Sequence, residues 1–135
     1  MNDIDIVPPM SSLSPRDQIA AKAQEFDLGA PRLGTLAPIR IAGDPRRGMM
    51  QVFERGFVFW SQRTGAHLIR GTIYGAWNDA KGALGDLGHP LTDELPVPAP
   101  YAADRCQFFE GGTIYWHANR NAAVILYRIE HKNSA

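Results

Sequence analysis

An eight-residue pattern occurs twice in this chain, first as Phe53-Glu54-Arg55-Gly56-Phe57-Val58-Phe59-Trp60 and again as Phe109-Glu110-Gly111-Gly112-Thr113-Ile114-Tyr115-Trp116. A shorter element precedes each copy, Leu28-Gly29-Ala30-Pro31 in the first case and Leu87-Gly88-His89-Pro90 in the second. Self-similarity at such a period is typical of stacked supersecondary units that share one core. The sequence therefore predicts two tandem copies of one unit.

Each copy is predicted to continue into a β-hairpin. At the same spacing after Trp60 and Trp116 comes a residue that tolerates positive φ, Gly65 in one copy and Asn121 in the other. An apolar run follows each of them, as expected when a hairpin turns and its second strand begins. The segments expected to be loops that connect the short element to the hairpin are Leu36–Gly48 and the proline-rich Leu95–Pro100.

A helix is predicted before each of the shorter elements. Ser14-Pro15-Arg16-Asp17 offers an N-cap serine, a proline at the first helical position and an acid in the first turn. Apolar residues at helical spacing follow, and Gly29 supplies a stop. The apolar residues of the first helix are Ile19, Ala23 and Phe26, and those of the second are Ile73, Ala76, Trp77 and Ala80, ended by glycines 82 and 85.

The expected fold class is α+β, with two tandem helix-turn-β-hairpin repeats packed into one compact domain. A chain of 135 residues can bury one core but is short for two independent domains. We expect one domain over 14–129, with repeats at about 14–70 and 71–129. Residues 1–13 and 130–135 lack any pattern and are expected to be flexible ends.

The charge balance argues against two classes of partner. Lys plus Arg and Asp plus Glu each number 14, which leaves no basic excess for nucleic acid or an anionic membrane. The N-terminal stretch has acids and prolines where a secretion signal has a basic start and an apolar run, and no apolar segment is long enough to span a bilayer. We expect no nucleic acid, no membrane insertion and, for the chain as encoded, a cytoplasmic location.

The repeated motifs resemble the LGFP repeat of actinobacterial cell-envelope proteins, a unit of roughly fifty residues with a Leu-Gly-x-Pro turn, a Phe-x-x-Gly-x-Ile-Tyr-Trp strand and a Thr-Gly-Ala turn. The resemblance covers about residues 19–126 and includes Thr64-Gly65-Ala66 and Thr92-Asp93-Glu94. The chain departs from it at Arg120-Asn121-Ala122, where the family has Thr-Gly-Ala, and at Leu33-Gly34-Thr35, which we align with Thr92-Asp93-Glu94. Because the family accompanies mycoloyl transferases and peptidoglycan hydrolases, the resemblance implies a module that binds cell-wall polysaccharide or another glycan.

Side-chain alternation along the repeated strand separates a predicted core face from a variable face. Val58 and Trp60 share one face and are matched by apolar residues in the second copy, so that face is expected inside. Phe59 and Tyr115 then lie on the variable face, where packing against the neighbouring unit and stacking on a sugar are about equally expected. The predicted core contains Phe26, Phe53, Val58, Trp60, Trp77, Phe109, Ile114 and Trp116.

The predicted ligand site lies around the repeated turn and this variable hairpin face. Aromatic rings meet the apolar faces of sugars, and Arg, His and carboxylate groups bind their hydroxyls. We expect the chain to be a non-catalytic binding module without a cofactor. The predicted ligand-binding residues are Phe59, Arg63, Asp93, Glu94, Tyr115, His117 and Arg120.

Other interpretations remain open at this point. His67, His89 and His117 lie beside repeat motifs, but no Glu or Cys stands at ligand spacing, so no metal site is predicted. Cys106 is the single cysteine, and no catalytic motif accompanies it. Unsatisfied hairpin edges favour a homodimer. The alternative function is an intracellular protein-binding or inhibitory domain that uses the exposed aromatic hairpin face.

Overall fold

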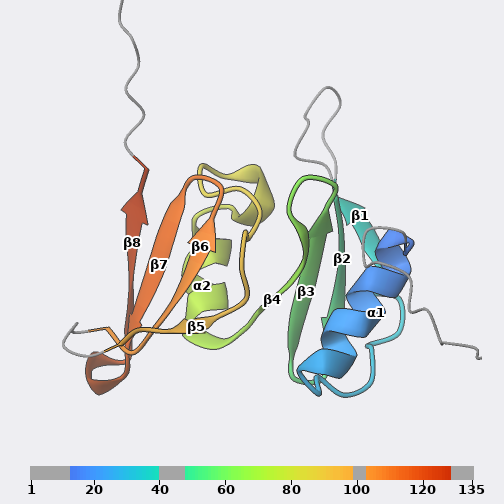
Figure 1. Cartoon of the computed structure of the whole chain (residues 1–135), viewed down its shortest axis with the longest axis horizontal. Coiled ribbons are helices and arrows are strands. Elements are labelled where there is room, and N and C mark those ends of the chain that lie inside the picture. The colour runs from blue at the N-terminus through green and yellow to red at the C-terminus, as the bar shows by residue number, and fades with distance from the viewer. Residues whose placement is uncertain (1–12, 40–47, 99–102, 129–135) are drawn as a thin grey trace, which may run out of the picture.

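The computed structural model describes residues 13–39, 48–98 and 103–128, so the expected flexible ends lie almost wholly outside the described residues. Within that part of the chain, two α-helices and two antiparallel four-stranded sheets confirm the α+β class (Figure 1). The elements are, in chain order, α1 (Pro15–Glu25), β1 (Ala37–Ile39), β2 (Gly48–Phe53), β3 (Gly56–Ser61), β4 (Gly65–Ile69), α2 (Gly71–Asp79), the 3-10 helix η2 (Gly82–Leu84), β5 (Leu95–Pro96), β6 (Arg105–Phe109), β7 (Gly112–His117), the 3-10 helix η3 (Ala118–Arg120) and β8 (Ala122–Tyr127).

The start of α1 follows from its sequence as predicted. Ser14 has extended backbone and its hydroxyl accepts a hydrogen bond from the amide of Asp17 at 3.1 Å. Pro15 occupies the first turn, where a missing N–H costs nothing. The helix ends two residues before Asp27, which takes a φ of +51°. The expected Gly29 stop follows at a φ of +82°, so the chain reverses over a short segment.

Each sheet is a meander of strands in sequence order, which is more than the single hairpin predicted per repeat. The predicted hairpins correspond to β3–β4 and β7–β8, and Gly65 (φ +78°) and Asn121 (φ +44°) have the expected positive φ. The repeated eight-residue pattern, however, is itself a hairpin, because β2 ends at Phe53 and β3 begins at Gly56. The two segments expected as loops contribute the edge strands β1 and β5, which contain Pro38 and Pro96.

In each repeat, the glutamate of the Phe-Glu pair is hydrogen-bonded to the Leu-Gly-x-Pro turn, and we call this contact the clamp. Glu54 Oε1 accepts a hydrogen bond from the amide of Ala30 at 2.8 Å, and Glu110 Oε1 accepts one from the amide of His89 at 2.9 Å. At Gly88, which has a φ of +70°, a Cβ atom would lie 2.7 Å from Glu110 Oε1. The glycine and the glutamate therefore recur together because the turn requires both of them.

The elements stack in the order α1, first sheet, α2, second sheet (Figure 1). α1 covers one face of the first sheet, where Ile19 is fully buried with Val58. α2 lies between the sheets and packs on both of them, with Trp77 in one cluster with Phe59 and Ile114. The two repeats thus share a core, as expected for units that bury too little on their own.

Of the two roles expected for Phe59, stacking on a sugar and packing against the neighbouring unit, the structure shows packing. Phe59 is 5% exposed, and its ring meets the Trp77 indole edge-on, with 4.5 Å between ring centroids and 75° between planes. The neighbouring Phe57 ring stacks on Tyr74 at 3.8 Å with 3° between planes. Sequence alternation assigned one buried face to the strand, whereas the first sheet is covered on both faces because α2 packs on its second side.

The two recurring tryptophans and Phe26 pack against the core clusters, but they are half-buried, whereas the prediction placed them inside the core. Trp60 Nε1 donates a hydrogen bond to Gln18 Oε1 of α1 at 3.1 Å. Trp116 Nε1 is buried without a hydrogen-bond partner among the described residues. In α2, Thr72 occupies the position that Gln18 has in α1, immediately before the buried isoleucine. The threonine side chain is shorter than that of glutamine and supplies no hydrogen-bond acceptor to Trp116. The predicted core residues that are buried are Phe53, Val58, Trp77, Phe109 and Ile114.

Candidate functional site

The two sheets differ in how their equivalent faces are covered. One face of the first sheet is covered by α2, whereas the equivalent face of the second sheet, which we call its outer face, is not covered by a helix of the described residues. In the first sheet, the face that carries Phe57 and Phe59 is packed against α2. The equivalent positions of β7 are Thr113 and Tyr115, which point away from α2 because Ile114 faces it. Among the described residues, no element lies over this outer face.

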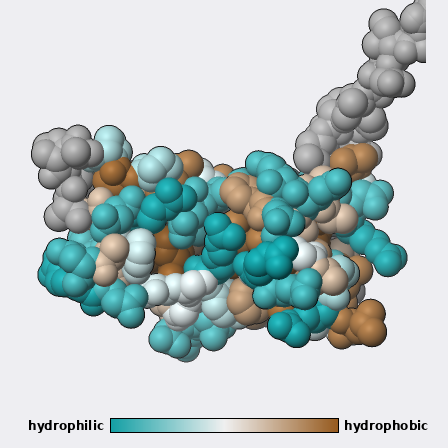
Figure 2. Space-filling view, turned by 90° about the horizontal axis from the view of Figure 1, so that it is seen from below, coloured by the Kyte–Doolittle hydropathy of each residue, from teal (hydrophilic) through white to brown (hydrophobic). Residues whose placement is uncertain are grey.

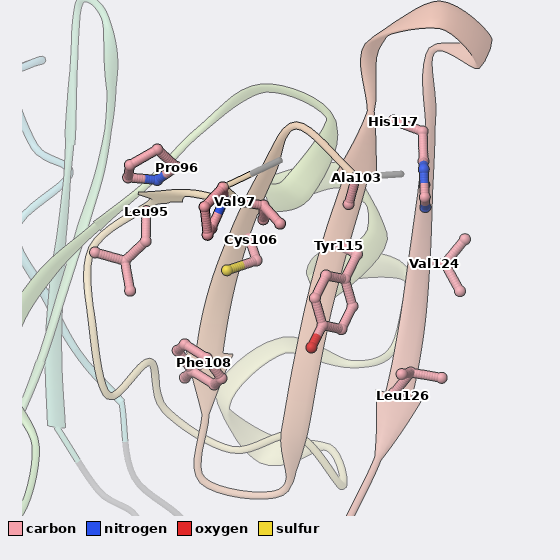
Figure 3. Close-up of a pocket in the computed structure, with 11 residues that line it drawn as sticks. Leu95, Pro96, Val97, Ala103, Cys106, Phe108, Tyr115, His117, Val124 and Leu126 are labelled. Carbon is pink, nitrogen blue, oxygen red and sulfur yellow. The ribbon is translucent and has the colours of Figure 1, made fainter. Parts of the chain in front are cut away.

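A groove of about 540 Å³ runs over that face (Figure 3). The strand pairing explains why its residues lie together, since Cys106 stands opposite Tyr115, and Val124 stands opposite Tyr115 from the other side. The volume falls within the range of small-ligand sites. The groove is lined by Leu95, Pro96, Val97, Pro98, Ala103, Cys106, Phe108, Tyr115, His117, Val124 and Leu126.

Among the described residues, no lysine, arginine, aspartate or glutamate lines the groove. Phe108, Val124 and Leu126 are 39%, 43% and 57% exposed, so their apolar surface faces solvent. The lower surface of the molecule is mostly hydrophilic, with hydrophobic residues in separate patches (Figure 2). The exposed apolar residues of the groove lie next to one another, and such a contiguous apolar surface is typical of a binding site.

Polar groups in the groove are few. The groove contains Tyr115 and His117, two of the predicted ligand residues, which share one face of β7. His117 Nδ1 has no hydrogen-bond partner among the described residues. Burial raises the pKa of the Cys106 thiol, nearby Arg105 lowers it and Glu94 raises it, with a net increase. The thiol is therefore protonated at neutral pH and is a poor nucleophile.

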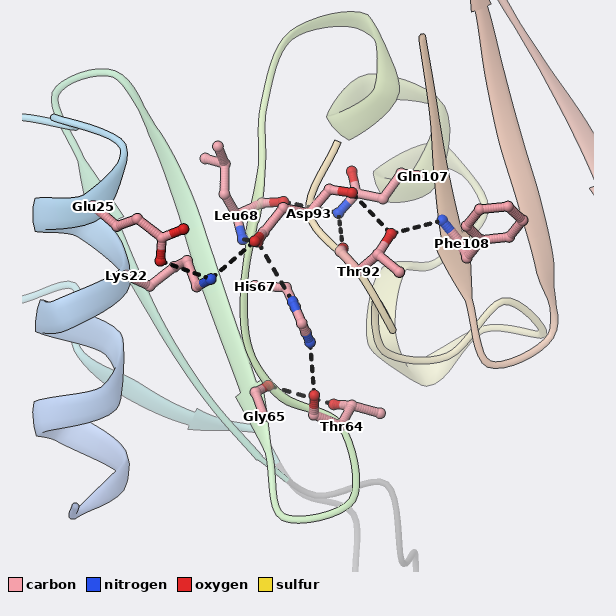
Figure 4. A network of polar contacts seen from close by, with 10 residues as sticks. All are labelled: Lys22, Glu25, Thr64, Gly65, His67, Leu68, Thr92, Asp93, Gln107 and Phe108. Carbon is pink, nitrogen blue, oxygen red and sulfur yellow. Dashed lines mark hydrogen bonds and ion pairs between the residues drawn. The ribbon is translucent and has the colours of Figure 1, made fainter. Parts of the chain in front are cut away.

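Asp93 does not contribute to the groove but joins the two repeats (Figure 4). Its Oδ2 lies 2.8 Å from Lys22 Nζ of α1, its Oδ1 accepts a hydrogen bond from the amide of Leu68 at 3.0 Å, and His67 Nδ1 lies 3.4 Å from Oδ1. Gln107 of β6 also joins the two repeats, since its Nε2 donates to the carbonyl oxygens of Leu68 in β4 and of Thr92, both at 2.8 Å.

These contacts set the charge state of Asp93. Burial alone would raise its pKa, but the nearby His67 imidazole, the hydrogen bonds from Lys22 and the Leu68 amide and the charge of Lys22 lower the pKa from 3.8 to about 2. Burial alone would lower the pKa of Lys22, yet Asp93 and Glu25 raise it above 10.5. The pair is thus charged over the whole physiological range, and both groups already have partners within the chain.

The other predicted charged residues are scattered. Glu94 Oε2 accepts from Arg105 Nε at 3.0 Å. Arg63, in the β3–β4 turn, forms an ion pair of 3.3 Å with Glu110 of the β6–β7 turn and is 64% exposed. Arg120 is exposed in η3. The predicted cluster of seven residues is therefore not brought together, and only two of its members share the groove.

The structure also corrects an alignment within the repeats. The Thr92 hydroxyl accepts from the amide of Phe108 at 3.3 Å, and the Thr35 hydroxyl accepts from the amide of Val52 at 3.2 Å. Thr35, rather than Leu33, is therefore the counterpart of Thr92, and Leu36 takes the position of Asp93. Leu36 packs against the core cluster that α1 forms with the first sheet, which explains an apolar residue at that position.

The histidines do not converge on a metal site. His67 lies in the joint between the repeats, His89 is fully buried in its turn, and His117 lies in the groove. Within the described ranges, no group of three potential metal ligands was found.

Several groove residues escaped sequence reasoning. Phe108 lies one position before the repeated pattern. Val124 and Leu126 lie in a predicted strand, but the sequence pattern does not show which face of the sheet their side chains occupy. The available signal was the strand Ala122–Tyr127, in which both alternating sets are apolar, as are both sets in Phe57–Trp60. A strand apolar on both faces requires cover on both faces.

No helix in the described segments combines the length and apolarity needed to cross a membrane.

A comparison with known protein families supports the presence of two tandem repeats. No curated protein matches the chain. The sequence profile of the LGFP repeat matches residues 37–85 and 87–132, beginning after α1 rather than with it, so the helix-first order of the predicted unit is not confirmed. The two tandem matches span most of the sequence, and the chain belongs to the LGFP-repeat family.

Proposed function

We propose that this protein is a non-catalytic module that binds a neutral polysaccharide of the cell envelope in the groove of the second sheet. The observation that carries the proposal is the composition of the groove, which presents the rings of Phe108 and Tyr115 in an open, uncharged surface. Aromatic rings pack against the apolar faces of sugar rings. An uncharged lining suits a neutral glycan better than an acidic one, whose carboxylates or phosphates would lose hydration without gaining a cation.

Hydrogen bonds at the edge of the groove would orient the sugar. The Tyr115 hydroxyl and the imidazole of His117 can each donate or accept a hydrogen bond. Two such groups support weak binding to one sugar unit, and affinity for a polymer would come from repeated contacts along its chain. Catalysis is not part of the proposal, because burial raises the pKa of the Cys106 thiol and a protonated thiol is a poor nucleophile.

The experiment is co-sedimentation with purified actinobacterial cell wall and its arabinogalactan. The double variant Tyr115→Ala/His117→Ala should remain in the supernatant while the wild type pellets. Arg120→Ala changes an exposed predicted residue outside the groove lining and should pellet like the wild type. Circular dichroism checks that each variant is folded. If the wild type does not pellet, the polysaccharide ligand is wrong, and if the double variant pellets equally, the site is wrong.

A second candidate is a protein partner that presents an amphipathic helix. It is favoured by the covered face of the first sheet, where α2 lays Tyr74 over Phe57 and Trp77 against Phe59. A helix with a similar aromatic face would cover the second sheet in the same manner. A synthetic peptide of residues 70–82, which contains α2, is a direct probe, and its binding in competition with wall polysaccharide would favour this candidate.

A further inference from the structure

We propose that two copies of this chain pair edge to edge along β8, so that their second sheets join into one continuous antiparallel sheet. This inference concerns the strand edge and is independent of which ligand the groove binds. It is based on a comparison of the outer strands of the two sheets and on the direction of the backbone groups of β8.

Three of the four outer strands are protected against pairing. β1 contains Pro38 and β5 contains Pro96, and proline blocks a strand edge because it cannot donate a hydrogen bond. β4 is capped by side chains of the second repeat, since the Leu68 amide donates to Asp93 and the Leu68 carbonyl accepts from Gln107. The first sheet is thus closed at both edges.

β8 has no such protection. Its sequence, Ala122–Tyr127, contains no charge, no proline and no glycine. It pairs with β7 on one side and has no neighbour on the other side among the described residues. Leu126 and Tyr127 are 57% and 51% exposed. A six-residue, neutral, apolar edge is the kind of strand that pairs with another chain.

The backbone of β8 indicates the register of this pairing. The amide of Arg128 donates to the carbonyl of Gly111 at 2.7 Å, so Arg128 points its polar groups inward. Because N–H and C=O groups alternate in direction along an antiparallel strand, the polar groups of Ala123, Ile125 and Tyr127 point outward. A two-fold axis at Ile125 would place Ala123 opposite Tyr127 of the second copy and give every one of these groups a partner.

A second copy fits this edge better than an unrelated peptide, because the strand is its own complement. The pairing is isologous, and it brings no like charges together since β8 carries none. It also closes the assembly, because each chain uses the one edge that is unprotected among its described strands. The axis lies perpendicular to the sheet, so the two grooves lie on the same side and a polymer can contact both of them.

The test is the mass of the chain as a function of concentration, measured by analytical ultracentrifugation. The wild type should shift from monomer towards dimer. Ala123→Pro removes an outward-pointing N–H while leaving the bonds to β7 in place, and it should stay monomeric. Leu95→Lys places a charge on the same outer face but at the β5 edge, so it should dimerise like the wild type. Loss of the dimer in Leu95→Lys would mean that the faces pair rather than the edges, and it would overturn the proposal.

Hydrogen exchange of the wild type supplies a second measurement if Ala123→Pro fails to fold. When the wild-type protein is concentrated, the amides of Ala123, Ile125 and Tyr127 should exchange on the order of tenfold more slowly than in dilute protein, because they become hydrogen-bonded to the second copy. The amides of Val124 and Leu126 already point at β7 and should not change. A wild type that stays monomeric at millimolar concentration, or protection that does not alternate along β8, contradicts the proposal.

Discussion

Lys22 on α1 and Asp93 in the second repeat form an ion pair of 2.8 Å across the joint between the two units. The side chains are only 14% and 18% exposed. Asp93 also accepts the amide of Leu68, so one carboxylate holds a helix, a strand edge and a turn together. This position resembled a ligand site in the sequence, but its hydrogen-bonding capacity is used within the protein.

Acid should weaken this joint. The pKa of Asp93 is lowered to about 2 in the folded chain, so its contribution is present above its ordinary pKa of 3.8 and is lost as the pH falls from about 4 towards 2. Asp93→Asn should cost about 1–2 kcal/mol of unfolding free energy at neutral pH, and the difference from wild type should shrink in that window. Urea unfolding at several pH values measures it. Asp86→Asn, at an exposed position, is the control, and an equal loss there would refute the assignment.

Two glycine substitutions should act in opposite directions. Gly88→Ala forces a Cβ towards Glu110 Oε1 at a φ of +70° and should destabilise the fold by about 1–3 kcal/mol. Gly75→Ala lies inside α2 with open space around the new methyl group and should stabilise it by roughly 0.5–1 kcal/mol. Thermal denaturation of the two variants compares them. Similar effects from both would mean that the clamp does not depend on the glycine.

A substitution on α2 should give Trp116 Nε1 the hydrogen-bond acceptor that it lacks among the described residues. Thr72→Gln places on α2 the side chain that α1 has at Gln18, where it accepts a hydrogen bond from Trp60 Nε1. The new bond should raise stability by about 1 kcal/mol, because a buried donor would be satisfied. Thr72→Met matches its length without an acceptor and serves as the control. A gain in the methionine variant equal to that in the glutamine variant would show that packing alone is responsible.

Equivalent positions in the two repeats should respond differently to truncation. Phe59→Ala opens a cavity beside Trp77 and should cost about 3–5 kcal/mol. Tyr115→Ala removes a ring from an uncovered face and should cost less than about 1 kcal/mol while reducing wall binding. Chemical denaturation and sedimentation separate the two effects. A large loss of stability in Tyr115→Ala would indicate that the groove is a structural rather than a binding surface.

The sequence predicted the features that depend on local chemistry. The Ser14 cap, the positive φ at Gly65 and Asn121 and the repeat itself all follow from nearby residues. The sequence left open whether Phe59 packs against the neighbouring unit, and it did not predict the role of Asp93, because both depend on how one repeat packs on the next. Alternation identifies the two faces of a strand, but it does not say how many of them will be covered.

The most direct test of the proposed site is an NMR titration of the labelled protein with soluble, neutral arabinogalactan fragments. The account predicts that the methyl signals of Val124 and Leu126 and the ring signals of Phe108 and Tyr115 shift together with one saturation curve. The signals of Phe59 and Asp93 should stay in place, since both groups are engaged within the fold. Shifts centred on Arg63 or Glu94 with an unchanged groove, or no shifts at millimolar polysaccharide, would contradict it.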